Sequence, residues 1–260
     1  MTDQSPPGAP WHPPVEVKQG SLAFATISLL RAAPRSVWIV MAILLVLGLG
    51  MDLVARQMGV PLDGPQFTPP TWIYLTALAV MTSSVVAIAL HILLTGQGPR
   101  RLDAGVIGFV VWTATVTLMA NGLMSVIQTT PTAPPAELLP RFALAAIGGL
   151  GGAIVLTRLM LLPMAWLVND PGATLAGSWG RMRGHLVAYI VASLLLSLPV
   201  AMIGLLAVGA AGGAAAEVTP GARIAAQLMA TAMATLSAAL NAVMYLRLVG
   251  LPLGRREVPD

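Results

Sequence analysis

Long apolar segments joined by short polar connections dominate the pattern along this chain. Six segments are each long enough to cross a bilayer, namely residues 36–55, 71–94, 104–128, 142–168, 186–209 and 224–249. About 20 helical residues cross a hydrocarbon core about 30 Å thick. Because lipid offers no hydrogen bonds to an exposed backbone, these segments are expected to be helices rather than open strands. The pattern predicts an all-α fold, a polytopic membrane helix bundle with six transmembrane helices and short interfacial helices.

Composition supports the membrane location. Hydrophobic residues make up 57% of the 260-residue chain and charged residues 9%, whereas an average soluble domain has about 25% charged residues. So few charges could not cover a soluble globule of this size. The formal net charge is +4, and in a membrane protein basic residues usually mark the cytoplasmic face, so no nucleic-acid partner is expected. The absence of cysteine excludes disulfides, iron–sulfur clusters and thiol catalysis.

The chain divides into three expected parts. Residues 1–20 are rich in proline and lack an apolar core of their own, so they are predicted to form a disordered cytoplasmic tail. This tail does not resemble a cleavable signal peptide, and the first span is expected to insert as an uncleaved anchor. Residues 21–254 form the predicted six-span membrane domain, and residues 255–260 form a cytoplasmic C-terminal tail.

The distribution of basic residues predicts the orientation. One set of connections and ends carries ten of them, namely Lys18, Arg31, Arg35, Arg100, Arg101, Arg181, Arg183, Arg247, Arg255 and Arg256. The alternate connections carry only Arg56, Arg141 and Arg223, each with an acidic residue in the same connection. The positive-inside rule then places both termini in the cytoplasm, as an even number of spans requires.

Small residues and prolines indicate how the spans pack. In the last span Ala226, Ala230, Ala234, Ala238 and Ala242 recur at intervals of four, and Gly148 with Gly152 forms a GxxxG pair in the fourth. Such residues allow close helix approach, within one bundle or between copies. Pro163 and Pro199 remove amide donors and are predicted to kink the fourth and fifth spans.

The segment between the fourth and fifth spans is predicted to contain a short interfacial helix over 171–183. Asp170 would be its N-cap and Pro171 its first residue. Leu175, Trp179, Met182 and Leu186 would share its apolar, inward face. Trp179, Arg181 and Arg183 are the candidate interfacial lipid contacts, with anionic lipids as a partner. Residues 21–33, with Leu22 and Leu29 on one face, could form a similar helix before the first span.

Arg158 is the charged residue lying well inside a predicted span, roughly 15 Å from the cytoplasmic end if the span is one helix at about 1.5 Å per residue. An ionisable residue at this depth is a functional hypothesis by default. It could extend to the interface, or bond to Asn121 or Asn241, which completes a candidate intramembrane polar site. Structural anchoring is favoured over substrate binding. The three histidines are far apart in sequence, so no catalytic site, metal site or cofactor is predicted.

The same segment carries a resemblance to a known family. The residues that carry it are Arg158, Pro163, Asp170, Gly172, Ser178, Arg183 with Gly184, and the closing Tyr245-Leu246-Arg247. This pattern resembles a bacterial six-helix membrane family whose best-named member is the membrane domain of glycerophosphoryl diester phosphodiesterases. The resemblance implies a multi-pass domain of the bacterial inner membrane. In that family the phosphodiesterase chemistry belongs to a separate soluble barrel, to which nothing in this chain corresponds.

Two functions follow as expectations. The first is a non-enzymatic integral protein of the inner membrane, a scaffold that organises lipid or a partner through its basic cytoplasmic face. The alternative is a small transporter or lipid translocator, for which Pro163, Pro199 and Arg158 are the motivating residues. The expected partners are the lipid bilayer with its anionic lipids, a membrane-protein partner or a second copy of the chain. A polar cavity reaching Arg158 would favour transport, and a solid apolar bundle would favour the scaffold.

Overall fold

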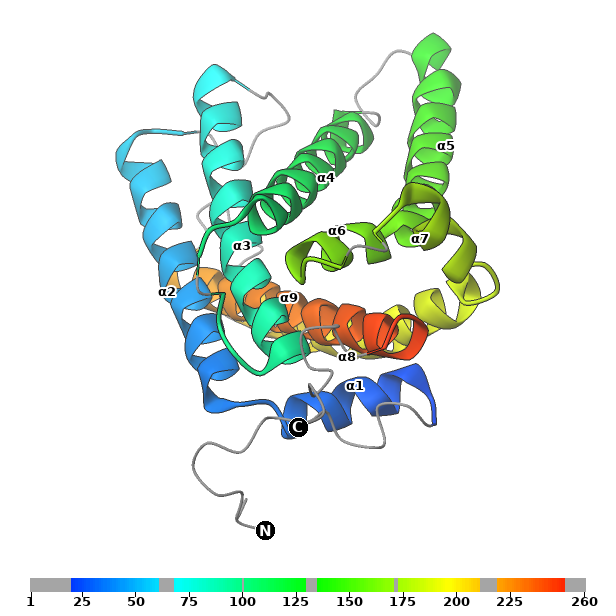
Figure 1. Cartoon of the computed structure of the whole chain (residues 1–260). Helices are drawn as coiled ribbons and strands as arrows, with labels where there is room; N and C mark the ends of the chain where they lie inside the picture. Colours follow the sequence, from blue (N-terminus) through cyan, green and yellow to red (C-terminus); the bar gives the residue numbers. More distant parts are fainter. Residues whose placement is uncertain are drawn as a thin grey trace, which may run out of the picture.

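A computed structural model describes residues 20–60, 68–99, 101–129, 135–170, 173–210 and 219–250. Within this part the elements are α1 (Leu22–Arg31), α2 (Arg35–Gln57), α3 (Pro69–Thr95), α4 (Ala104–Thr129), α5 (Pro135–Leu159), α6 (Leu161–Leu167), α7 (Leu175–Arg181), α8 (Leu186–Ala210) and α9 (Pro220–Leu248) (Figure 1). Six of the described segments are long and apolar enough to cross a membrane. The predicted all-α, six-span membrane fold is confirmed. Both predicted tails, except Gly20, lie outside the described residues.

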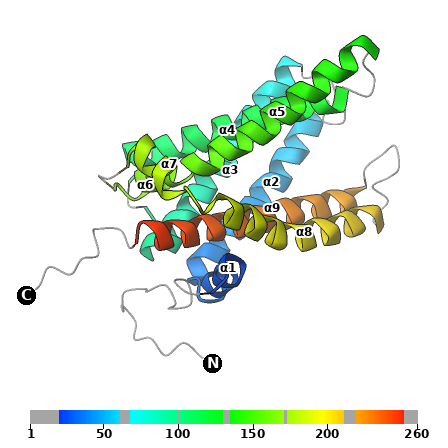
Figure 2. The same cartoon turned by 90° about the vertical axis from the view of Figure 1, so that its right-hand side faces the viewer.

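Long helices that follow one another in the chain run in opposite directions (Figure 1), and α8 packs against α9, α3 against both α2 and α4, and α4 against α5. Helix α9 also packs against α1, α2 and α3, which places it at the centre of the bundle. In Figure 2 the α4–α5 pair and the α8–α9 pair diverge toward the right and converge toward α6 and α7. The buried apolar cluster lies where they converge, and it includes Leu29, Leu90, Leu93, Leu167, Met244 and Tyr245. Away from it, apolar side chains such as Ile147 and Leu206 are exposed, as in a protein surrounded by lipid.

Helix α1 lies across one end of the bundle. Its N-cap is Ser21, whose hydroxyl accepts a hydrogen bond from the Phe24 amide at 3.3 Å. Leu22 and Leu29 are buried on the face that packs against α8 and α9, while Phe24 is 54% exposed. The helix predicted before the first span is therefore present, and it covers the ends of the last two spans.

The fourth span is not the single helix predicted over 142–168. Helix α5 ends at Leu159, and after a turn at Met160 the chain continues as α6 in a different direction (Figure 1). Pro163 explains the break, because it has no amide hydrogen to donate to the Leu159 carbonyl four residues earlier. Arg158 lies in the last turn of α5, and the candidate span Ile147–Leu167 continues beyond it through α6, so the depth of Arg158 stays a prediction. Helix α8, by contrast, runs unbroken through Pro199.

The short helix before the fifth span begins later than predicted. The N-cap of α7 is Thr174, not Asp170, and its hydroxyl accepts a hydrogen bond from the Gly177 amide at 3.0 Å. Pro171 lies outside the described residues. The predicted shared apolar face is also wrong, because Leu175 is 59% exposed whereas Met182 is fully buried beyond the end of the helix. Helix α7 is too short to bring both residues to one side.

The small residues of the last span divide into two groups. Ala238 and Ala242 are buried in the bundle, whereas Ala226 and Ala230 are exposed. In α5, a Cβ added at Gly148 would meet only the Leu123 side chain of α4, and one added at Gly152 would meet open space. The predicted continuous seam therefore packs only along the half of α9 nearer its C-terminus.

Candidate functional site

Arg158 connects α5 to α7 through its main chain and its side chain. The Ser178 hydroxyl donates a hydrogen bond to the Arg158 carbonyl at 2.9 Å, and Ser178 is buried. The guanidinium carbon of Arg158 lies 4.7 Å from the centre of the Trp179 ring, the geometry of a cation–π contact. A positive side chain in the last turn also complements the helix dipole of α5. These contacts fix α7 against the end of the α5 helix.

The contacts of the predicted intramembrane site and of the predicted interfacial site differ from those expected. Asn241 accepts a hydrogen bond from the Tyr189 hydroxyl at 2.8 Å, which joins α9 to α8. Asn121 lies half-buried on α4. Neither asparagine bonds to Arg158 within the part of the chain that the structure describes. Arg158, from the predicted intramembrane set, instead contacts Trp179, from the predicted interfacial set.

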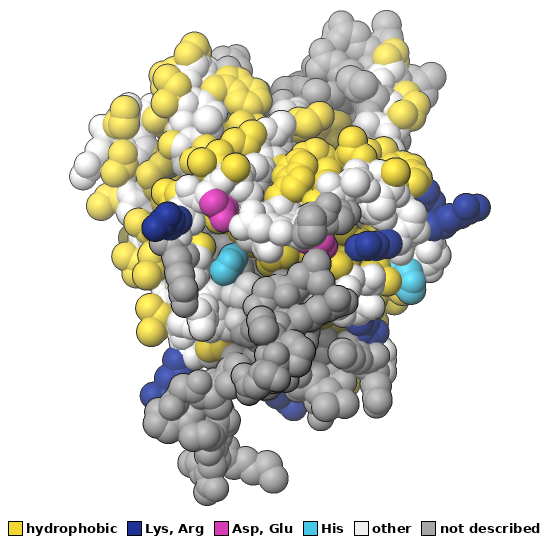
Figure 3. Space-filling model, in the orientation of Figure 1, with side chains coloured by type: hydrophobic (Ala, Val, Ile, Leu, Met, Phe, Trp, Pro, Cys, Tyr) yellow, Lys and Arg dark blue, Asp and Glu magenta, His cyan; other side chains and the backbone are white. Residues whose placement is uncertain are grey.

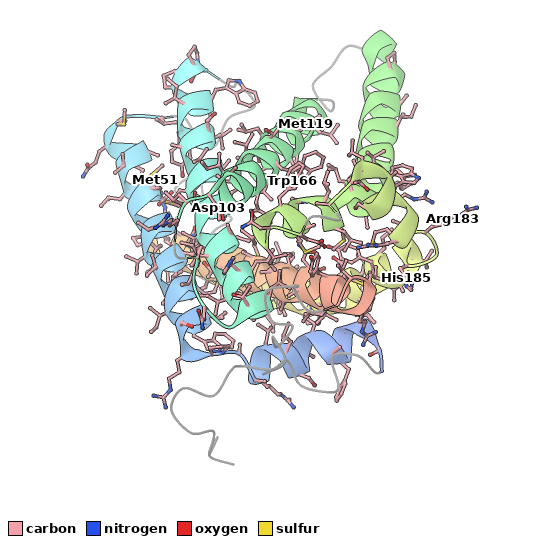
Figure 4. All side chains as sticks on the ribbon, viewed as in Figure 1. Met51, Asp103, Met119, Trp166, Arg183 and His185 are labelled. Atoms are coloured by element: carbon pink, nitrogen blue, oxygen red, sulfur yellow. The ribbon has the colours of Figure 1, made fainter. Side chains whose placement is uncertain are left out.

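Exposed basic residues lie next to this contact in the sequence. Arg181 ends α7, and Arg183 and His185 lie in the connection to α8; all three are exposed. Figure 4 shows Arg183 and His185 at the outer edge of the molecule, beside α7 and the start of α8. In Figure 3 basic, acidic and histidine side chains cross the middle of the face, below a largely hydrophobic surface. The basic side predicted from sequence therefore includes the outward surface around α7.

A second polar cluster, which the sequence analysis missed, joins α4, α6 and α9. One oxygen of the Asp103 carboxylate accepts a hydrogen bond from the Val106 amide at 2.9 Å and so caps α4. The other oxygen accepts one from the Asn169 side-chain amide at 2.8 Å. Asn169 has a φ of 53°, a left-handed conformation that asparagine adopts more readily than most residues.

Asn169 and Asp170 close the end of α6 in a Schellman motif. The Asn169 amide donates to the Trp166 carbonyl at 3.0 Å, and the Asp170 amide donates to the Ala165 carbonyl at 2.8 Å. The Asp170 carboxylate accepts a hydrogen bond from the hydroxyl of the buried Tyr245 at 3.0 Å. This chain of contacts ties the start of α4 to the end of α6 and to α9.

The sequence signal for this cluster was twofold. Asp103 directly precedes one apolar segment, and Asn169 with Asp170 directly follows another. An open pocket of about 440 Å³ lies beside the cluster, lined by Ala104, Gly105, Gly108, Trp166, Asn169 and Asp170. Figure 4 shows Asp103 and Trp166 at the junction of α3, α4 and α6. The Trp166 ring meets that of Trp112 edge-on, with ring centres 6.2 Å apart. The polar groups here are bonded to one another, which indicates a structural junction.

Asp103 should make stability depend on pH. The Val106 amide, followed by the Asn169 side chain, holds the pKa of Asp103 below its ordinary value of 3.8. Because the folded-state pKa is lowered, this stabilisation is present above the unfolded-state pKa and is lost as the pH falls through the folded value. The thermal midpoint of the detergent-solubilised protein should therefore fall below about pH 4. Asp103→Asn keeps a capping side chain without a titrating group, so it should flatten that fall; an unchanged fall would exclude Asp103 as its source.

A third set of charged side chains is paired near the C-terminal end of α2. Asp52 lies 3.3 Å from Arg56 and 3.6 Å from Arg223, which links α2 to α9. No group of three histidine, cysteine, aspartate or glutamate residues within the described ranges is placed to hold a metal ion.

Comparison of the chain with known protein families, with curated proteins and with solved structures finds no match in any of the three. The resemblance to the membrane domain of glycerophosphoryl diester phosphodiesterases therefore stays a prediction from the sequence.

Proposed function

We propose that this chain is a non-catalytic integral protein of the bacterial inner membrane, a scaffold that organises lipid at its basic, cytoplasmic side. The observation that carries the proposal is the surface of α7. This helix is anchored inward by the buried Ser178 and presents Trp179 and Leu175 outward, 39% and 59% exposed. Exposed Arg181 and Arg183 accompany them. Tryptophan beside arginine is typical of protein surfaces at the boundary between lipid tails and headgroups.

The scaffold is favoured over the alternative, a small transporter or lipid translocator. Transport of a polar substrate requires a polar path between the spans. The buried cluster of the described helices consists of apolar side chains from α1, α2, α3, α4, α6, α8 and α9. Two buried hydroxyls are used locally, because Thr26 and Thr235 each donate to a carbonyl four residues earlier at 2.8 Å; the buried Thr231 hydroxyl has no partner among the described residues. Arg158 does not line the open pocket beside Trp166.

Arg181→Gln combined with Arg183→Gln is expected to weaken retention of anionic lipid. Each arginine near an anionic surface contributes about 1 kcal/mol, so the pair should change the partition between phosphatidylglycerol and phosphatidylcholine by roughly tenfold or more. The measurement is the lipid that co-purifies with the protein in mild detergent, at increasing salt. Since salt screens exposed charges, the salt dependence should also flatten.

Arg56→Gln is the control. It removes one positive charge in the last turn of α2, where Arg56 pairs with Asp52. It should leave phosphatidylglycerol retention near the wild-type level. Equal retention by the wild type and the double variant at every salt concentration would contradict a lipid-organising role for this side. Salt-independent enrichment of a polar solute, with uptake into reconstituted vesicles, would instead support the transporter.

A further inference from the structure

The side chain of Arg158 contacts the Trp179 ring and makes no hydrogen bond through its Nε atom to the described residues. A guanidinium carries five N–H donors, all in the plane of the group. The contact with Trp179 places the Arg158 guanidinium over the ring, with its carbon 4.7 Å from the ring centre. A contact with an aromatic ring is compatible with hydrogen bonds from these donors to a planar or tetrahedral oxyanion.

No acceptor within the described part of the chain takes those donors. The Nε atom of Arg158 is buried and has no hydrogen-bond partner there, whereas the residue as a whole is only partly buried. The hydrogen bond between Arg158 and Ser178 uses the main-chain carbonyl of Arg158 and leaves its side chain free of that contact. The carboxylates of Asp103 and Asp170 accept hydrogen bonds from Asn169 and Tyr245. An unpaired cation within a membrane span is costly, so a counter-charge from outside the protein would stabilise it.

The surroundings of Arg158 indicate which anion that is. Arg158 lies in the last turn of α5, just before the chain turns into α6. Trp179 is 39% exposed, and Leu175 on the same short helix is 59% exposed. Tryptophan at this position marks the headgroup level of a bilayer. The anion found at that level in every phospholipid is the phosphate.

We propose that Arg158 and Trp179 form a binding site for the phosphate group of a phospholipid. The terminal nitrogens of Arg158 donate to two phosphate oxygens, and Trp179 holds the guanidinium plane in place from one face. This inference rests on the proposed lipid-organising function and names one defined site within it. It differs from attraction by Arg181 and Arg183, because recognition of the phosphate itself does not require a net negative lipid.

That difference gives the test. Lipids are titrated into the delipidated full-length protein, and binding is followed by native mass spectrometry and by the thermal midpoint. Arg158→Gln should lower the affinity for phosphatidylglycerol and for the zwitterionic phosphatidylethanolamine alike, by about tenfold for the loss of a paired charge-assisted contact. Arg158→Lys keeps the charge without the planar fork of donors. Its affinity for each phospholipid should lie between the affinities of the wild type and of Arg158→Gln. Arg181→Gln with Arg183→Gln should weaken phosphatidylglycerol binding and spare phosphatidylethanolamine.

Two probes identify the source of the phosphate. Diacylglycerol carries the same acyl chains without the phosphate, and its binding should not depend on Arg158. Inorganic phosphate alone should not raise the thermal midpoint; an equal, Arg158-dependent rise with inorganic phosphate would overturn the assignment to lipid. Unchanged binding of both phospholipids by Arg158→Lys and Arg158→Gln would overturn the site while leaving the wider proposal intact. Absence of any anionic-lipid preference in the wild type would overturn the proposed function instead.

Discussion

Gly105→Val is expected to separate α6 from α4 and to lower the unfolding free energy by about 3 kcal/mol, the upper part of the usual range for overpacking. A Cβ at this position would overlap with the carbonyl oxygen of Trp166. That oxygen belongs to the main chain and accepts the Asn169 amide at the end of α6, so it cannot move without opening the Schellman motif. The measurement is the thermal midpoint in detergent.

Gly151→Val is the matched control, because a Cβ at Gly151 in α5 would meet nothing within 4 Å. Gly108→Ala gives an intermediate case, since its Cβ would lie 3.3 Å from the Trp166 ring, a side chain that can shift slightly. The expected order of midpoints is Gly151→Val highest, then Gly108→Ala, then Gly105→Val. A Gly105→Val protein as stable as the Gly151→Val protein would show that α6 does not depend on this close approach.

The spans could be predicted from the sequence because membrane insertion depends on the length and apolarity of each segment alone. The predicted boundaries differ little from those of α3, α8 and the start of α4. The break in the fourth span could be predicted only as a kink near Pro163. The missing amide hydrogen is a local property, but the new direction of α6 depends on its packing against α4, where Gly105 and Gly108 admit Trp166.

The candidate site was harder to predict than the spans, because its contacts also depend on tertiary packing. Asp170 was expected to cap a helix, and its carboxylate instead accepts from Tyr245, which lies 75 residues away in sequence. Asp103 was not singled out, although it bonds to Asn169 from 66 residues away. The contact between Arg158 and Trp179 forms where α5 stops at Leu159 and the chain changes direction. Long-range pairs of this kind follow from the tertiary structure and leave no periodic signal in the sequence.

The second large expected effect is a labelling pattern that reports the orientation of the chain in the membrane. Each single cysteine should either react with an impermeant reagent in intact cells or not react at all. Both termini are expected on the cytoplasmic side, because basic residues concentrate in one alternate set of connections. The chain has no cysteine, so single cysteines report without background. Cysteines at Gln66, Thr132 and Glu217, which lie outside the described residues, should react with an impermeant maleimide in intact cells. Cysteines at Gln97 and Gly177, and at Pro259 beyond the described range, should not.

The helix pairs make this pattern internally constrained. Since long helices that follow one another in the chain run in opposite directions (Figure 1), the connections α2–α3, α4–α5 and α8–α9 should lie on one side of the membrane and react together. Permeabilised cells are the control, and there an exposed position such as Gln97 should become reactive. Labelling of Gln97 and Gly177, but not Gln66, in intact cells would reverse the orientation. It would also move α7 with Arg181 and Arg183 to the outer leaflet, where anionic lipid is scarcer and the lipid-organising proposal would lose its electrostatic basis.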